Sequence, residues 1–350
     1  MSNLTATLTE LVDISSVTGS EGRLCTYLAE RLLPTWGMDA VERIGNSLLV
    51  ARRSEKPMIA LVGHIDTVPE QGQGASRVED GRLYGLGASD MKAGVAVLVH
   101  LLEDEEVAAG PYDVVGIFYD GEEGPSEANG LEPVLGQAAW LAESELAVVL
   151  EPTDLELQLG CLGLINARVT FLGKPAHSAR PWLGENAVTK AGEWLAGLHG
   201  REAEPVTVAG LEFQEVFTVT MAGGGVALNI VPGRFDLNLN YRFAPGKSLE
   251  EAERAVREVA SDADEVEVVD RALAGAIPEG NPQLERLEAI TQAPRRPKQA
   301  WTDVARLGEH GIPAVNYGPG EAAQAHQVTE SVALANLEVA FDKLKEFLTT

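Results

Sequence analysis

Short apolar runs alternate with amphipathic stretches through the first third of the chain. The runs at residues 58–63, 112–119 and 146–150 are short and largely apolar, which is typical of strands buried on both faces of a sheet. Helices are predicted between them, from 91 to about 107 and near 131–142. This alternation predicts an α/β fold with a mixed open sheet and helices on both of its faces.

The pattern changes between residues 163 and 274. Strand-like segments lie at 164–173, 217–224, 234–243 and 265–270, and helices are predicted near 185–198 and 248–260. They predict a smaller α+β domain with helices on one side of its sheet.

The α/β pattern resumes after about residue 275. A helix near 302–310, an apolar run at 314–317 and a closing helix near 333–347 follow. We therefore expect one domain to be formed by residues 1–162 and 275–350, with residues 163–274 inserted as the second.

The charge of the chain narrows the possible partners. Lys and Arg total 27 against 53 for Asp and Glu, so the net charge is -26 in 350 residues, which disfavours nucleic acid and anionic membranes as partners.

No apolar run reaches membrane-spanning length, and no basic region precedes a long apolar core at the N-terminus. Two cysteines cannot form a disulfide framework. We expect a cytoplasmic protein.

Histidines and carboxylates follow the predicted strands. Ligands of open α/β sheets bind at the carboxyl ends of the strands, so these residues are candidates for one site. They are His64 and Asp66 after the first run, Asp120, Glu122 and Glu123 after the second, Glu151 after the third, Asp90 before a helix, and His326 in a later loop. Each alone is more typical of a solvated loop, but together they are a ligand set for two divalent metals.

Spacing suggests roles for some of these residues. His64 and Asp66 are two apart on an extended segment, so Asp66 can orient the imidazole, although it could be an ordinary turn residue. Glu122 and Glu123 are adjacent and cannot easily share one role. One could bind a metal while the other moves a proton from water to a leaving nitrogen. A solvated acidic loop is the alternative.

The segments GHIDTVP, GASDMKAG, GEEG, LEPT and AHQVTE resemble, in this order, the clan MH metallopeptidases. This group includes aminoacylase, acetylornithine deacetylase and succinyl-diaminopimelate desuccinylase. The resemblance implies two zinc ions per subunit, which cobalt can replace. It implies these roles: Asp90 bridges the ions, His64 and Glu151 complete one site, Glu123 and His326 complete the other, and Glu122 is the general base and acid, beside Asp66.

The resemblance also implies a homodimer formed through the inserted domain. His177 lies in a polar Gly-Pro loop, GKPAHSARPWLGENA, where a histidine without a role is the alternative. In the family, the corresponding histidine reaches the active site of the partner subunit and stabilises the oxyanion of the tetrahedral intermediate.

The segments HSARPWLGENA, GCLG, YRFAP and AWTDVARL resemble the actinobacterial-type desuccinylases. This resemblance implies hydrolysis of N-succinyl-LL-2,6-diaminopimelate to succinate and LL-2,6-diaminopimelate, a step toward lysine. This acylated amino acid carries three carboxylates, which suit bidentate binding by arginine. Arg242, Arg180 and Asn229 lie in segments that resemble the substrate-binding loops of the family, and Thr302 could contribute a hydroxyl, so we expect substrate contacts from these four residues. Two alternatives stay open: another N-acyl amino acid amidohydrolase or exopeptidase of the family, and a non-catalytic metal-binding relative, which would not need Glu122.

Overall fold

The computed structural model describes residues 3–350 and divides the chain into two compact units. Unit 1 contains residues up to Leu159, Ile277–Arg296 and Arg306–Thr350, and unit 2 contains Gly160–Ala276 and Pro297–Ala305. The sequence pattern assigns 297–305 to the other domain. These residues group with unit 2 because its backbone bonds to them, as in the bond from the Leu162 amide to the Ala300 carbonyl (3.1 Å).

Unit 1 is built on an eight-stranded mixed sheet with the order β1-β2-β6-β3-β7-β15-β8-β14. Four adjacent strands of this sheet run parallel to one another: β6, β3, β7 and β15. At the two sides of this group, β2 pairs antiparallel with β6, and β8 pairs antiparallel with β15. The bounds are β1 Val41–Ile44, β2 Ser47–Val50, β3 Met58–His64, β6 Asp113–Tyr119, β7 Ser144–Val149, β8 Leu157–Leu159, β14 Arg295–Pro297 and β15 Ala314–Asn316.

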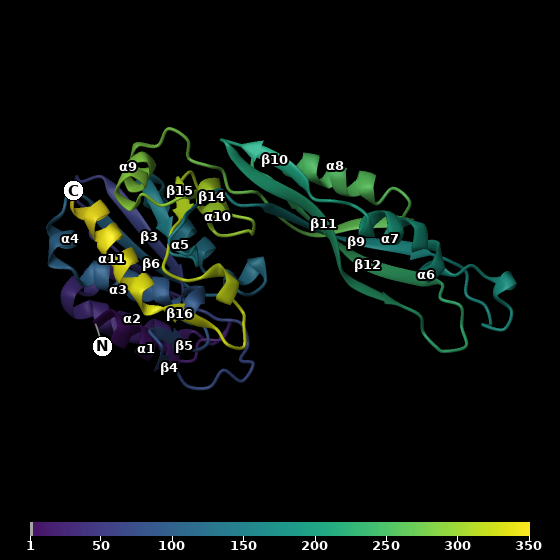
Figure 1. Cartoon of the computed structure of the whole chain (residues 1–350), viewed down its shortest axis with the longest axis horizontal. Helices are drawn as coiled ribbons and strands as arrows, with labels where there is room; N and C mark the ends of the chain where they lie inside the picture. The colour runs from purple at the N-terminus through teal and green to yellow at the C-terminus, as the bar shows by residue number, and fades with distance from the viewer. Residues whose placement is uncertain (1–2) are drawn as a thin grey trace. The chain divides into compact units, whose positions relative to one another are not determined.

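Helices cover both faces of this sheet, which explains why every residue of β3 is buried. Figure 1 shows α3 beside α11 on one side of β3 and β6, with α5 and α10 on the other. The helices are α1 Asn3–Asp13, α2 Gly22–Trp36, α3 Ala93–Glu103, α4 Glu105–Ala109, α5 Leu131–Gln137, α9 Pro282–Thr291, α10 Val304–Glu309 and α11 Leu334–Thr349. The mixed α/β fold predicted from the sequence is confirmed.

The single helix predicted from 91 to 107 is wrong. The chain leaves the helical conformation at Asp104, with φ -79° and ψ 124°, and begins a second helix there. The Asp104 carboxylate accepts hydrogen bonds from the amides of Glu106 (2.9 Å) and Val107 (3.1 Å). An N-cap of this kind starts a new helix inside a continuous hydrophobic pattern.

A small antiparallel sheet in unit 1 joins two distant parts of the chain. Its order is β16-β5-β4, with bounds β4 Arg77–Glu79, β5 Arg82–Tyr84 and β16 Ser331–Ala333. Because Ser331 pairs with Tyr84, the loop before β16 lies next to the segment after β5.

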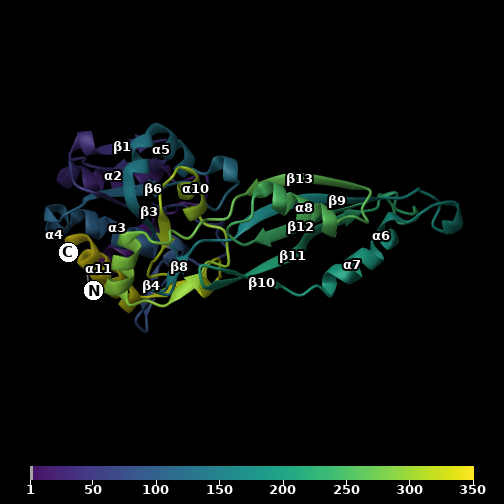
Figure 2. The same cartoon turned by 90° about the horizontal axis from the view of Figure 1, so that it is seen from above.

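Unit 2 is a five-stranded antiparallel sheet with the order β10-β11-β12-β9-β13. One face packs on helices through a core that includes Phe171, Tyr241, Trp194 and Val256. Figure 2 shows α7 and α8 along this sheet. The bounds are β9 Gly163–Leu172, β10 Glu204–Val208, β11 Leu211–Gly224, β12 Arg234–Phe243, β13 Glu265–Ala272, α6 Ala187–Lys190, α7 Gly192–His199 and α8 Leu249–Val259.

Across residues 3–350, no helix combines the length and the apolar character needed to span a membrane.

Close packing of α3 against the end of β7 gives a stability prediction. A Cβ atom at Gly94 would lie 2.3 Å from the Leu150 carbonyl oxygen, so Gly94→Ala should lower the free energy of unfolding by about 1 to 3 kcal/mol through overpacking. Urea unfolding measures this loss. Gly136→Ala, in α5, is the control, because its Cβ would meet nothing within 4 Å. An equal loss in both variants would contradict the packing argument.

Candidate active site

The candidate ligands of unit 1 gather at the carboxyl ends of three neighbouring strands. His64 is the last residue of β3, Glu122 and Glu123 follow β6, and Glu151 follows β7. Because β6, β3 and β7 are adjacent and parallel, their carboxyl ends meet at one edge of the sheet.

Asp90 lies between two histidines from distant parts of the chain. Its Oδ1 is 3.1 Å from Nε2 of His64, and its Oδ2 is 3.6 Å from Nε2 of His326. Each histidine also approaches a second carboxylate: Oε1 of Glu151 is 4.0 Å from His64, and Oε1 of Glu123 is 2.9 Å from His326. One carboxylate therefore presents a separate oxygen to each histidine.

These contacts form two ligand sets that share Asp90. The sets are His64, Asp90 and Glu151, and Asp90, Glu123 and His326, and within each the ligand atoms lie within 4.8 Å of one another. Two imidazoles and three carboxylates, with one carboxylate common to both sets, fit a pair of divalent metal ions.

Glu122 belongs to neither of these two sets. It lies instead in a third cluster with His64 and Glu123. The position places a carboxylate beside both ligand sets, where it could exchange a proton with water. Its role as base stays a prediction.

Asp66 supports the ligands from behind the site and is fully buried. Its carboxylate accepts hydrogen bonds from the Glu122 amide (3.0 Å), the Glu123 amide (3.0 Å) and the Thr18 hydroxyl (2.9 Å). Nδ1 of His64 lies 3.1 Å from the Asp66 carbonyl oxygen and 3.5 Å from its carboxylate, which leaves Nε2 facing Asp90. Contacts of this kind fix the tautomer and orientation of a metal-binding imidazole.

Neighbouring carboxylates change the pKa of both histidines. Burial alone would lower the pKa of His64, but hydrogen bonds to Asp66 and Asp90 and the charge of Glu122 raise it. The hydrogen bond to Glu123 raises the pKa of His326 to about 9, against the effect of burial. Burial would raise the pKa of Asp66, but its interaction with His64 lowers it.

The sequence reasoning missed two residues that contact this site. Thr18 donates to Asp66, and Glu330 accepts a hydrogen bond from the Asp90 amide (3.0 Å). Glu330 ends the AHQVTE motif, four residues after His326, so an acidic residue there was a usable signal. Nothing in the local sequence marks Thr18, which reaches Asp66 only through the fold.

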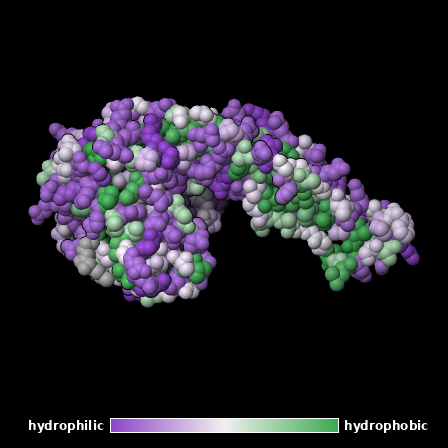
Figure 3. All heavy atoms as spheres, viewed as in Figure 1, coloured by the Kyte–Doolittle hydropathy of each residue, from purple (hydrophilic) through white to green (hydrophobic). Residues whose placement is uncertain are grey.

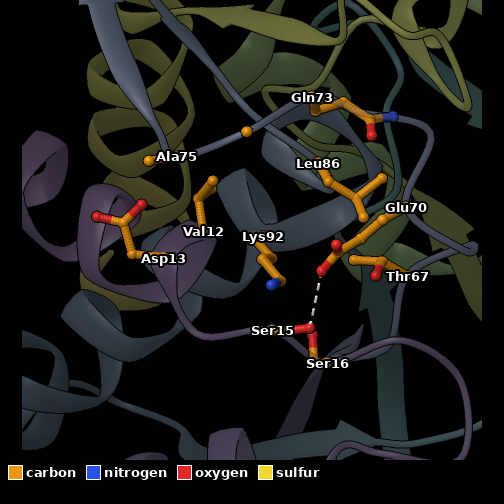
Figure 4. Close-up of a pocket in the computed structure, with 11 residues that line it drawn as sticks. Val12, Asp13, Ser15, Ser16, Thr67, Glu70, Gln73, Ala75, Leu86 and Lys92 are labelled. Carbon is orange, nitrogen blue, oxygen red and sulfur yellow. Dashed lines mark hydrogen bonds between the residues drawn. The ribbon is translucent and has the colours of Figure 1, made fainter.

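A cavity of about 410 Å³ in unit 1 lies beside Thr67 but contains no candidate metal ligand. Figure 4 shows the side chains of Lys92, Ser15 and Glu70 around it, with the bond from Ser15 to Glu70 (3.2 Å). The Lys92 ammonium donates to two backbone carbonyls at the end of α1, those of Leu11 (3.0 Å) and Ile14 (2.9 Å). Burial lowers the pKa of Lys92 to about 8. We interpret Lys92 as a structural residue that ties α1 to the segment after Asp90.

The other predicted residues lie in unit 2, in two separate places. His177, Arg180 and Asn229 are together, because the Ser178 amide bonds to the Asn229 carbonyl (2.9 Å) and the Arg180 amide to the His177 carbonyl (2.8 Å). Arg242 lies near the other end of β12, paired with Leu164.

Thr302 is buried, and its hydroxyl has no hydrogen-bond partner within the described part of the chain. Its carbonyl oxygen accepts a hydrogen bond from the thiol of Cys161 (3.5 Å). Cys161 lies just before the start of β9. The His177 group adjoins the Arg234 end of β12, where Arg234 pairs with Leu172. About eight residues of extended strand, roughly 25 Å, separate this end from Arg242.

Comparison with known proteins assigns the family. Residues 60–350 match the family described as Peptidase family M20/M25/M40. The chain belongs to this family. Its members are hydrolases, so the sequence prediction of a metallopeptidase-family enzyme is confirmed.

Relatives within the family match nearly the whole chain. A Mycobacterium tuberculosis protein with the provisional name succinyl-diaminopimelate desuccinylase DapE is 36% identical over 341 residues, covering 97% of this chain and 96% of its own. The succinyl-diaminopimelate desuccinylase of Corynebacterium glutamicum is 35% identical, covering 97% and 94%. A tripeptidase of Staphylococcus aureus has the same fold, with a TM-score of 0.81 at 22% identity over 99% of this chain and 97% of its own.

The raised histidine pKa values predict proton release when metal binds. At pH 7.5, below the pKa of about 9, His326 is protonated in the metal-free protein, and a metal binds only the neutral imidazole. Binding of an ion at His326 should therefore release about one proton per chain from this histidine. Release should decrease as the pH rises through 9. Calorimetric titration of zinc in buffers of different ionisation enthalpy measures it. Unchanged release in His326→Ala would contradict the assignment.

Proposed function

We propose that this protein removes the succinyl group from N-succinyl-LL-2,6-diaminopimelate, releasing succinate and LL-2,6-diaminopimelate for lysine and diaminopimelate biosynthesis. The observation that carries the chemistry is Asp90, whose two carboxylate oxygens face His64 and His326. The substrate follows from two relatives at 35–36% identity that carry the desuccinylase name. Cytoplasmic location remains a prediction from the sequence.

Two zinc ions are the proposed cofactors, and cobalt should replace them because it accepts the same nitrogen and oxygen ligands. His64, Asp90 and Glu151 would hold one ion, and Asp90, Glu123 and His326 the other. When bound, such ions polarise a carbonyl and make water a better nucleophile.

Glu122 is the proposed general base and acid. Its carboxylate takes a proton from the attacking water and delivers it to the leaving amide nitrogen, so the amine departs neutral. The Asp66 carboxylate holds the amides of Glu122 and Glu123, which keeps the base in place beside the ligand sets.

Arg242 and Thr302 are proposed to bind the substrate. The Arg242 guanidinium is partly buried, which lowers its pKa, and its Nε bonds to Asn240 (3.0 Å). Among residues 3–350 it forms no ion pair with a carboxylate, so its remaining N–H groups can donate hydrogen bonds to a carboxylate of the substrate. The buried Thr302 hydroxyl could donate a further bond.

We further propose a homodimer in which His177, with Asn229 and Arg180, serves the active site of the other subunit. Within unit 2, roughly 25 Å of strand separates these residues from Arg242, too far for one chain to place both on one small substrate. Unit 2 also exposes apolar side chains, and Figure 3 shows hydrophobic residues on its visible face. The exposed residues include Trp182, Leu183, Met221, Val226 and Leu228.

The substrate is tested by comparing two reactions of zinc-reconstituted protein under identical conditions. We expect succinate release from N-succinyl-LL-2,6-diaminopimelate to exceed acetate release from N-acetylornithine. The reverse preference would retain a metal-dependent amidohydrolase and reject the desuccinylase. Activity on neither substrate, with two ions bound, would favour another acyl-amino acid or a non-catalytic relative.

Glu122→Gln should separate catalysis from metal binding. The amide cannot accept the proton, so turnover should fall by about 100-fold or more, while zinc content stays at the wild-type value. Turnover is measured by succinate release and zinc by atomic absorption. Wild-type turnover would reject Glu122 as the base, and loss of zinc would make it a ligand instead.

Mixing two inactive variants tests whether His177 acts in the partner's site. In a dimer of Glu122→Gln and His177→Ala chains, one site contains both native residues if His177 acts in trans. Random mixing should then restore on the order of a quarter of wild-type activity. No recovery, when native mass spectrometry shows mixed dimers, would place His177 in the site of its own chain.

A further inference from the structure

A buried carboxylate holds the backbone around Asp90. Glu330 is 2% exposed, and its Oε1 accepts hydrogen bonds from the amides of Ser89 (2.8 Å) and Asp90 (3.0 Å). Its Oε2 accepts one from the Gly87 amide (2.9 Å). Three amides of one short segment therefore converge on one side chain.

These amides need an acceptor because the segment is not a regular helix. Asp90, with φ -118° and ψ 97°, and Met91, with φ -128° and ψ 37°, are outside the helical region just before α3. Ser89 is buried, so its amide cannot turn to water instead. A buried amide without an acceptor is costly, and Glu330 removes that cost at three positions.

Glu330 also belongs to the loop that carries His326. It directly precedes β16, whose Ser331 pairs with Tyr84 of β5, and its own carbonyl accepts a bond from the Gly85 amide (3.1 Å). The Ser89 hydroxyl contacts the backbone of Glu321, at the start of the same loop. The Asp90 segment and the His326 loop are thus joined at several points.

We propose that Glu330 is the positioning residue of the metal pair, and that it sets the placement of Asp90 relative to His326. The inference rests on the two-metal site of the proposed function. Asp90 is common to both ligand sets, but His326 belongs to one of them. Loss of Glu330 should therefore weaken the Asp90–Glu123–His326 set more than the His64–Asp90–Glu151 set.

Glu330→Gln is the test, because glutamine has nearly the same shape but only one accepting oxygen. At least one of the three amides would then face an amino group rather than an acceptor. Zinc affinity of the Asp90–Glu123–His326 set should fall by about 10- to 100-fold, as when outer partners of metal ligands are removed. At a chelator concentration that leaves two ions on the wild type, the variant should retain about one ion per chain.

Glu321→Gln is the matched control. It removes a carboxylate from the same loop, but the Glu321 side chain bonds to Arg82 (2.8 Å) and to the Ala333 amide (3.1 Å). It should retain two ions under the same conditions. Thermal unfolding of each metal-free variant is measured in parallel, so that a general loss of stability is separated from a loss of metal.

Several outcomes would overturn the inference. Glu330→Gln could retain two ions with wild-type affinity, or both variants could lose metal equally. If Glu330→Gln does not fold, Glu330→Asp, which keeps both oxygens but shortens their reach, replaces it with the same criteria. Failure of the wild type to bind two ions would instead reject the proposed metal centre. This outcome can be distinguished from failure of the Glu330 inference because it is measured on the wild type alone.

Discussion

The contact of one carboxylate with two histidines joins distant parts of the chain within unit 1. Asp90 faces both His64 and His326. His64 is the last residue of a central strand, and His326 lies more than two hundred residues further along the chain. Asp90, Glu122, Glu123 and Glu151 lie close enough for their charges to repel one another. Hydrogen bonds and charges of nearby carboxylates raise the pKa of both histidines, and divalent cations would relieve the repulsion among the carboxylates. The crowding of negative charge favours cation binding.

Much of the fold and the ligand set could be predicted from the sequence, because buried parallel strands have a distinct pattern. The apolar run at 58–63, together with His64, matches the bounds of β3. Neither Asp90 nor His326 directly follows a strand, so only the ordered motifs predict them as ligands. Pairing of β16 with β5, which brings their loops together, has no local signal, because each strand has only three residues.

Some features depend on tertiary contacts that a pattern does not encode. The break at Asp104 lies inside an apparently continuous helix, and only the capping geometry separates α3 from α4. The segment 297–305 has no strand pattern of its own, yet its backbone bonds place it in unit 2. The wide separation of His177 from Arg242 follows from the register of β12 against β9, which the alternation of residues alone does not determine.

Candidate metal ligands and candidate substrate contacts lie in different compact units. Every residue of the two ligand sets belongs to unit 1, whereas Arg242, Thr302, His177, Asn229 and Arg180 all belong to unit 2. Under the proposed function, reaction chemistry and substrate choice would be encoded in separable stretches of sequence. Mutations in unit 2 would then alter the acyl group that is recognised, while the candidate metal ligands of unit 1 stay unchanged. Such a division would let one fold serve different substrates, as the names desuccinylase and tripeptidase among proteins of this fold illustrate.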